Sequence, residues 1–163
     1  MRRIIIVAAL LLTSIGMFAQ SGRSFYQKYS DEPGVSAVYI SPAMFRMMGS
    51  IPEISAGDND VNLAPIIRNL KGMYILSCEN PSLSGKLYKE AIKALGTGNY
   101  ELMMEAKDDG EKVQIYTAGN IATVTSFVLL SSEGDEVTLI WLDGEMPREQ
   151  MENLLSDTIV IEN

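Results

Sequence analysis

The last third of the chain alternates between hydrophobic and polar positions, as half-buried strands do. Residues 100–107 and 113–117 both alternate, and they flank the turn sequence Asp108-Asp109-Gly110. Residues 121–131 are more continuously apolar, which indicates a central strand, and residues 137–142 complete the series. Strands joined by such short turns predict a four-stranded antiparallel meander.

The first two thirds of the chain combine helical spacing with two short apolar runs. Residues 35–40 and 73–77 are predicted to be buried strands. Helices are predicted around Phe25 and Tyr29, from Pro42 to Gly49, from Leu63 to Leu70, from Pro81 to Gly96, and from Pro147 onward. The pattern predicts an α+β fold with a mainly antiparallel sheet, in which the C-terminal four-stranded meander joins the two earlier strands and helices pack on one face.

Residues 1–19 have the pattern of a secretory signal peptide. Two arginines precede an apolar stretch over residues 4–15, and Ala19 offers a small residue at the expected cleavage position. The stretch is shorter than the about 20 residues that a transmembrane helix needs. We therefore expect residues 20–163 to form a single exported domain with no stable membrane insertion after cleavage. The periplasm is the expected location, and the cell surface and the medium are alternatives.

The chain is acidic. It has 13 Lys and Arg against 21 Asp and Glu, a formal net charge of −8, and loss of Arg2 and Arg3 with the leader would make this −10. Such a surface repels phosphate backbones, so nucleic acid is not expected as a partner. The charge also suits a well-solvated surface and names no ligand by itself.

The absence of histidine limits the available chemistry. The sequence contains no His and a single cysteine, Cys78. Without His, Ser-His-Asp and Cys-His catalysis and the usual zinc sites are excluded. Cys78 follows the apolar run 73–76, which favours a buried, inert thiol over one that pairs with another chain. These patterns predict no catalytic residue, no metal site and no cofactor.

Two carboxylates on one predicted strand face invite comparison with a glycosidase pair. Glu101 and Glu105 would lie on the same side of their strand. The next strand places Lys112 and Gln114 opposite them, so cross-strand pairing is the preferred explanation.

Methionine is concentrated in the short helix predicted after Pro42. Thioethers there could pack a core, line an adaptable groove for a partner, or hold Cu(I). Core packing is the default interpretation, because methionine fills irregular gaps. If the helix has a function, we expect a partner groove between it and the irregular segment 50–60. The residues assigned to this groove are Met44, Phe45, Met47, Met48 and Ile51.

Several sequence blocks resemble a known family. The segment Gly34–Ser41, together with Phe25, Tyr29 and Met44, resembles the opening of small exported proteins of Bacteroidota with domain of unknown function (DUF) 4252. Later blocks that resemble it are Lys71-Gly72-Met73, Tyr100-Glu101-Leu102-Met103 and Ile140-Trp141-Leu142-Asp143-Gly144. The resemblance implies export and an α+β fold, and it brings no established activity or site. Genes of this family often lie beside regulators of envelope responses, which suggests a link to signalling.

Three function hypotheses are compatible with these observations. The leading one is an exported, non-catalytic domain of the bacterial cell envelope that binds another envelope protein or a small ligand. The alternatives are an envelope hydrolase that uses carboxylates or a Ser with a Lys, and a structural envelope component. An enzyme would show a polar pocket with a titrating group shifted by burial, whereas a binding module would show an exposed apolar patch.

Overall fold

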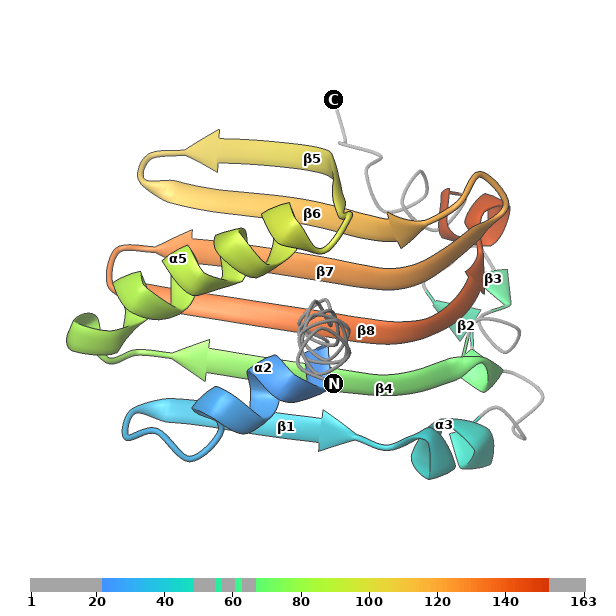
Figure 1. The fold of residues 1–163 in the computed structure, drawn as a ribbon, viewed down its shortest axis with the longest axis horizontal. Coiled ribbons are helices and arrows are strands. Elements are labelled where there is room, and N and C mark those ends of the chain that lie inside the picture. Colours follow the sequence, from blue (N-terminus) through green and yellow to red (C-terminus); the bar gives the residue numbers. More distant parts are fainter. Residues whose placement is uncertain (1–21, 49–54, 57–60, 63–66, 153–163) are drawn as a thin grey trace, which may run out of the picture.

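The computed structural model describes residues 22–48, 55–56, 61–62 and 67–152, which form helices packed on an antiparallel sheet (Figure 1). In chain order the elements are α2 (Gly22–Tyr29), β1 (Val35–Ile40), α3 (Pro42–Met48), β2 (Ser55–Ala56), β3 (Val61–Asn62), β4 (Leu70–Cys78), α5 (Pro81–Thr97), β5 (Glu101–Asp108), β6 (Glu111–Gly119), β7 (Thr123–Glu133) and β8 (Glu136–Pro147). A short helical stretch follows over residues 148–152. The predicted signal peptide lies outside the described residues.

The long strands form one six-stranded sheet in the order β1-β4-β8-β7-β6-β5, and all neighbours are antiparallel. The predicted meander is the run from β5 to β8, and β4 and β1 extend the sheet from β8. The short strands β2 and β3 pair with each other in a separate sheet. The predicted α+β class and mainly antiparallel sheet are confirmed.

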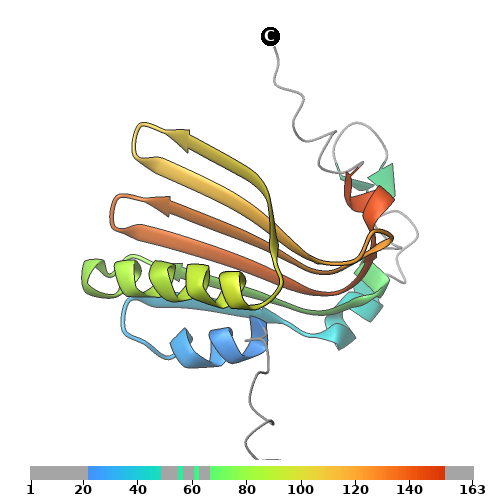
Figure 2. The same ribbon diagram turned by 45° about the horizontal axis from the view of Figure 1, so that its top comes forward.

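Helices α2 and α5 lie on the same face of this sheet (Figures 1 and 2). The start of α5 is set by Asn80, whose side-chain oxygen accepts a hydrogen bond from the Ser82 N–H at 3.0 Å. Pro81 occupies the beginning of the helix, where its missing N–H costs no intrahelical hydrogen bond. These local signals position α5 across the sheet.

The main core lies between these two helices and the sheet. It contains Phe25 and Tyr29 from α2, and Leu87, Ala91, Ala94 and Leu95 from α5. The sheet contributes Tyr74, Leu76, Cys78, Val128, Leu130, Val137, Leu139 and Trp141. The thiol of Cys78 is free and fully buried, which confirms the interpretation of that residue from sequence.

A second, smaller core cluster lies at one end of the sheet, where the strands curve toward α3 (Figure 2). Its buried members are Phe45, Leu70, Val124, Met146 and Met151. Ile40, Met73, Phe127 and Leu142 are partly buried against it.

Two predicted element boundaries are wrong because strands pass through glycines. The predicted helix 63–70 ends in a residue, Leu70, that is the first residue of β4. Strand β8 continues through Gly144 to Pro147, where a helix was expected to begin. A Cβ on Gly144 would lie 2.6 Å from the Asn69 carbonyl oxygen, so this glycine permits close pairing of β8 with β4.

A β-bulge in β5 overturns the predicted alternation of that strand. Leu102 is paired with Tyr116, but Met104 is paired with Ile115, and the register shifts between them. Leu102 and Met104 therefore point to opposite faces, although their spacing predicts the same face.

Candidate functional site

A continuous row of apolar side chains crosses the face of the sheet that carries neither α2 nor α5. In β4, β7 and β8 the core residues point to the helices, so the residues between them point to the other face. One residue from each of the six strands is paired directly with the next: Val38, Ile75, Ile140, Leu129, Ile115 and Met104. We call these six residues the open-face row.

Most residues of the open-face row are at least partly exposed. Val38, on the edge strand β1, is 49% exposed, whereas Ile115 is buried. Ile75, Ile140, Leu129 and Met104 are partly exposed. On one side lie the residues Ile40, Met73, Leu142 and Phe127, which pack against the second core cluster. On the other side lie Ser36, Ser77, Thr138 and Ser131. An apolar strip beside small polar side chains is a common composition of protein interfaces.

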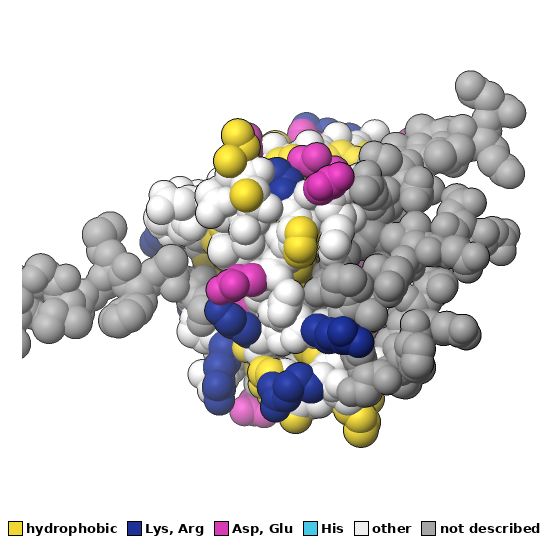
Figure 3. Space-filling model, turned by 90° about the vertical axis from the view of Figure 1, so that its right-hand side faces the viewer, with side chains coloured by type: hydrophobic (Ala, Val, Ile, Leu, Met, Phe, Trp, Pro, Cys, Tyr) yellow, Lys and Arg dark blue, Asp and Glu magenta, His cyan; other side chains and the backbone are white. Residues whose placement is uncertain are grey.

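Charged residues gather at the two ends of the sheet. The β5–β6 and β7–β8 turns carry the acidic residues Asp108, Asp109, Glu111, Glu133, Asp135 and Glu136. The opposite end carries α3, and Figure 3 shows Lys and Arg side chains on it, with Asp, Glu and hydrophobic side chains among them. The open-face row runs across the sheet between an acidic end and an end of mixed charge.

The methionine helix, α3, divides its side chains between core and solvent. Phe45 is buried in the second core cluster, and Met48 packs against that cluster. Met44 and Met47 are exposed, Met47 to 63%. Ile51 lies outside the described residues. The structure thus brings Phe45 and Met48 together and points Met44 and Met47 away, and the partner groove stays a prediction.

Three tyrosines from different elements surround a small cavity of about 100 Å³. Its lining residues are Arg23, Tyr26 and Gln27 from α2, Tyr39 from β1 and Tyr74 from β4. The Tyr39 and Tyr74 rings stack, with centroids 5.2 Å apart and planes 14° apart. Burial is the main cause that raises the pKa of Tyr74, and Arg23 opposes that shift. We call this site the tyrosine cavity.

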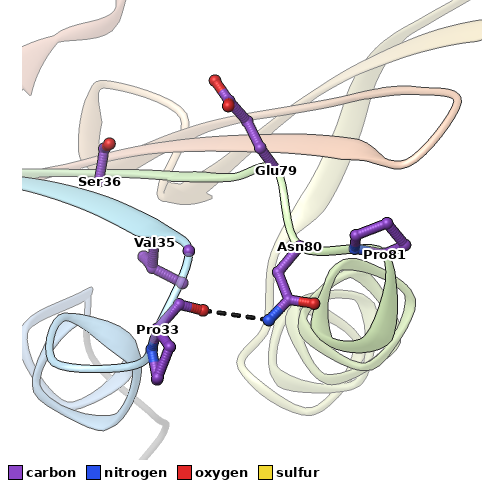
Figure 4. A pocket seen from close by; sticks show the side chains of 7 residues that line it. Pro33, Val35, Ser36, Glu79, Asn80 and Pro81 are labelled. Atoms are coloured by element: carbon purple, nitrogen blue, oxygen red, sulfur yellow. Dashed lines mark hydrogen bonds between the residues drawn. The ribbon is translucent and has the colours of Figure 1, made fainter.

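A larger depression of about 490 Å³ lies where β1 and β4 meet the start of α5 (Figure 4). The Asn80 amide donates a hydrogen bond to the Pro33 carbonyl at 3.1 Å across it. Gly34 has a φ of +81°, and a Cβ there would lie 2.8 Å from the Asn80 side chain. Since Asn80 also caps α5, the residues at this depression chiefly join β1 to the helix.

A third depression, of about 220 Å³, lies between α2 and α5. Glu90 accepts hydrogen bonds from Lys28 and, at 2.6 Å, from the Tyr29 hydroxyl. These bonds lower the pKa of Glu90, whereas burial and the Glu90 carboxylate raise the pKa of Tyr29. The ion pair therefore fastens the two helices to each other.

One titratable group shifted by burial does occur, inside a polar network. The Ser126 hydroxyl accepts hydrogen bonds from Trp141 Nε1 at 2.9 Å and from the Tyr100 hydroxyl at 3.1 Å, and it lies 3.0 Å from Asp143 Oδ1. Burial raises the pKa of Asp143, although the bonds from Ser126, Trp141 and the Gly22 N–H oppose this. Asp143 lines none of the three cavities above. Its contacts explain it as an anchor for Trp141 and α2.

The carboxylate pair suggested by the sequence is separated in the structure. Glu105 accepts bonds from Lys107 at 2.7 Å, Lys112 at 3.2 Å and the Gln114 amide at 2.9 Å. Because of the β5 bulge, Glu101 is paired with Thr117 and lies on the other face. Within the described parts of the chain, no group of three His, Cys, Asp or Glu side chains could hold a metal ion.

Neither the open-face row nor the tyrosine cavity was identified from sequence. The row had a visible signal, because 73–77 and 121–131 are apolar at consecutive positions and so must place apolar side chains on both faces. The cavity had none, since its tyrosines are far apart in the chain.

The fold and these surfaces define a small α+β domain in which one sheet face carries α2 and α5 and the other carries the open-face row beside the second core cluster. The model of the family described as "Domain of unknown function (DUF4252)" matches residues 29–154, and the chain belongs to this family. No curated protein and no solved structure gives a match. Among the described residues, no helix is both long enough and apolar enough to cross a membrane.

Proposed function

We propose that this protein is an exported, non-catalytic domain of the cell envelope that binds another envelope protein through the open-face row. The observation that carries the proposal is that all six directly paired positions across the sheet are apolar, on the face opposite α2 and α5. Export rests on the leader-like residues 1–19.

The main core does not require apolar side chains in the open-face row. Buried residues of α2, α5 and the helix-facing side of the sheet already complete that core. An antiparallel sheet with one solvated face ordinarily alternates apolar and polar residues, so its outer face would be polar. Here Ile75, Leu129 and Ile140 instead keep apolar side chains partly exposed. Burying such a strip against a partner would add favourable apolar contact that the isolated domain lacks.

The hydrolase and the structural component stay as alternative hypotheses. The shifted carboxyl of Asp143 would suit a hydrolase only if substrate reached it, and Ser126 beside it is buried. A structural component would use the same open face to bind further copies of the chain. A link to envelope signalling would follow from the identity of the partner.

The test is crosslinking in intact cells, followed by capture of a tagged copy and mass spectrometry. We expect one envelope protein in near-equal amount with the bait. Val38→Glu, which places a charge in the row at an exposed position, should reduce its recovery about tenfold or more. Ile121→Glu is the matched control, because Ile121 is 93% exposed and lies outside the row.

Three results would contradict the proposal. These are recovery of the bait alone, equal recovery with Val38→Glu, and equal loss with both variants. Recovery of further copies of the chain would support the structural alternative instead.

A further inference from the structure

We propose that the tyrosine cavity binds an acidic sugar residue, a single sugar ring that carries one carboxylate. The cavity lies on the side of the sheet that carries α2, because Tyr74 belongs to the main core there. The open-face row lies on the opposite side, so this site goes beyond the proposed function and is independent of it.

The cavity offers aromatic faces in fixed positions. Tyr39 stacks on Tyr74, and Tyr26 packs at a tilt against both, with ring centroids 5.7 Å from Tyr74 and 6.1 Å from Tyr39. Tyr74 is buried, so it anchors the group, while Tyr39 is 43% exposed and presents its ring to solvent. The C–H groups on one face of a sugar ring pack well against such an aromatic surface.

The tyrosines of this cavity differ from the other tyrosines of the chain in their hydrogen bonding. The chain has seven tyrosines. The hydroxyls of Tyr29, Tyr88, Tyr100 and Tyr116 all take part in hydrogen bonds with other side chains.

The remaining three, Tyr26, Tyr39 and Tyr74, all line the cavity, and none of their hydroxyls bonds to a residue that the structure describes. The Gln27 amide and the Arg23 guanidinium share this condition, and Arg23 forms no ion pair with the described residues. Five residues whose polar groups have no partner among the described residues thus line one cavity.

The balance of these groups selects the ligand. Tyrosine hydroxyls and one amide suit a ligand rich in hydroxyl groups, and one guanidinium suits a single carboxylate. A flat aromatic acid would pair with Arg23 but leave most of the neutral groups unused. The volume of about 100 Å³ accommodates only a few water-sized groups, so one edge of a single ring enters and any longer glycan stays outside. In a chain of net charge −8, Arg23 marks where an anionic ring can bind.

The experiment is a binding titration of the protein purified from cells, by NMR or calorimetry. The probes are D-glucuronate, uncharged D-glucose and a short oligouronate. We expect D-glucuronate to bind about tenfold or more tightly than D-glucose, as a charge-assisted hydrogen bond implies. The oligouronate distinguishes a preference for the end of a glycan from a preference for the free sugar, and tight binding of either supports the site.

Variants assign the effect to the cavity. Arg23→Gln should abolish the preference for D-glucuronate, and Tyr39→Ala should weaken the binding of both monosaccharides. Lys89→Gln removes one cation from an exposed position on α5 and should change nothing. Thermal melting of each variant checks that it is folded. Absence of saturable binding to every probe, equal binding of the two monosaccharides, or a preference that survives Arg23→Gln would overturn the proposal.

Discussion

Gly22, the first residue of α2, lies directly against the indole ring of Trp141. A Cβ atom on Gly22 would stand 2.7 Å from both Cγ and Cδ1 of that ring, and 2.9 Å from Cδ2 of Tyr74. Trp141 is itself fully buried and cannot move away. The lack of a side chain at residue 22 therefore allows α2 to dock on the sheet.

This contact predicts opposite effects for two glycine substitutions in helices. Gly22→Ala should lower the free energy of unfolding by roughly 1–3 kcal/mol, because the added methyl group overlaps Trp141. Gly85→Ala in α5 is the control. A Cβ there meets nothing within 4 Å, so the better helix propensity of alanine should raise the free energy of unfolding by about 0.5–1 kcal/mol. Chemical denaturation measures both, and a stabilising Gly22→Ala would contradict the account of helix docking.

As pH rises, the carboxyl groups of Asp143 and Glu90 should change the stability of the protein in opposite directions. Burial raises the pKa of Asp143 above its ordinary value of 3.8. The protonated carboxyl therefore contributes to folding stability below pH 3.8, and this contribution is lost as pH rises through the folded-state pKa. The bonds from Lys28 and Tyr29 lower the pKa of Glu90 below 4.5, so its contribution is present above 4.5 and is lost as pH falls through the folded-state pKa.

The corresponding variants are Asp143→Asn and Glu90→Gln. Relative to the wild type, Asp143→Asn should become more stable as pH rises from about 3 to about 7, whereas Glu90→Gln should become less stable over the same range. Urea unfolding at several pH values measures both differences. If the unfolding free energies of both variants change with pH in parallel with that of the wild type, the surroundings of Asp143 and Glu90 are wrongly described.

Substitutions at two neighbouring leucines of β7 should distinguish an effect on folding stability from an effect on partner binding. Leu130 is fully buried in the main core, whereas Leu129 belongs to the open-face row. Leu130→Ala should cost roughly 2–5 kcal/mol of unfolding free energy. Leu129→Ala should cost roughly 1 kcal/mol and should weaken partner binding instead. Similar losses of stability in both variants would mean that the open face is part of the core.

Much of the fold follows from local signals in the sequence. The bounds of β1 are those predicted, because the strand-breaking pairs Pro33-Gly34 and Ser41-Pro42 lie directly before and after residues 35–40. The start of α5 is likewise set by Asn80 and Pro81. Each of these signals acts within a few residues, and so a single sequence contains it.

The two proposed sites depend on pairings between distant residues. The open-face row requires the register of six strands, and the bulge that turns Met104 onto it has no sequence signal. The tyrosine cavity joins Tyr26, Tyr39 and Tyr74, which meet only when α2 packs over β1 and β4. Register and helix docking are set by the whole core, so local patterns cannot supply them.

The central claim is that the open face of the sheet binds an envelope partner, and site-specific photo-crosslinking in intact cells tests it most directly. A photoreactive amino acid is placed at Val38 or Met104 on the open-face row, and at Lys89 on the exposed side of α5. We predict a crosslink to the same envelope protein from Val38 and from Met104, and none from Lys89. A crosslink from Lys89 alone, or from none of the three positions, would contradict the claim.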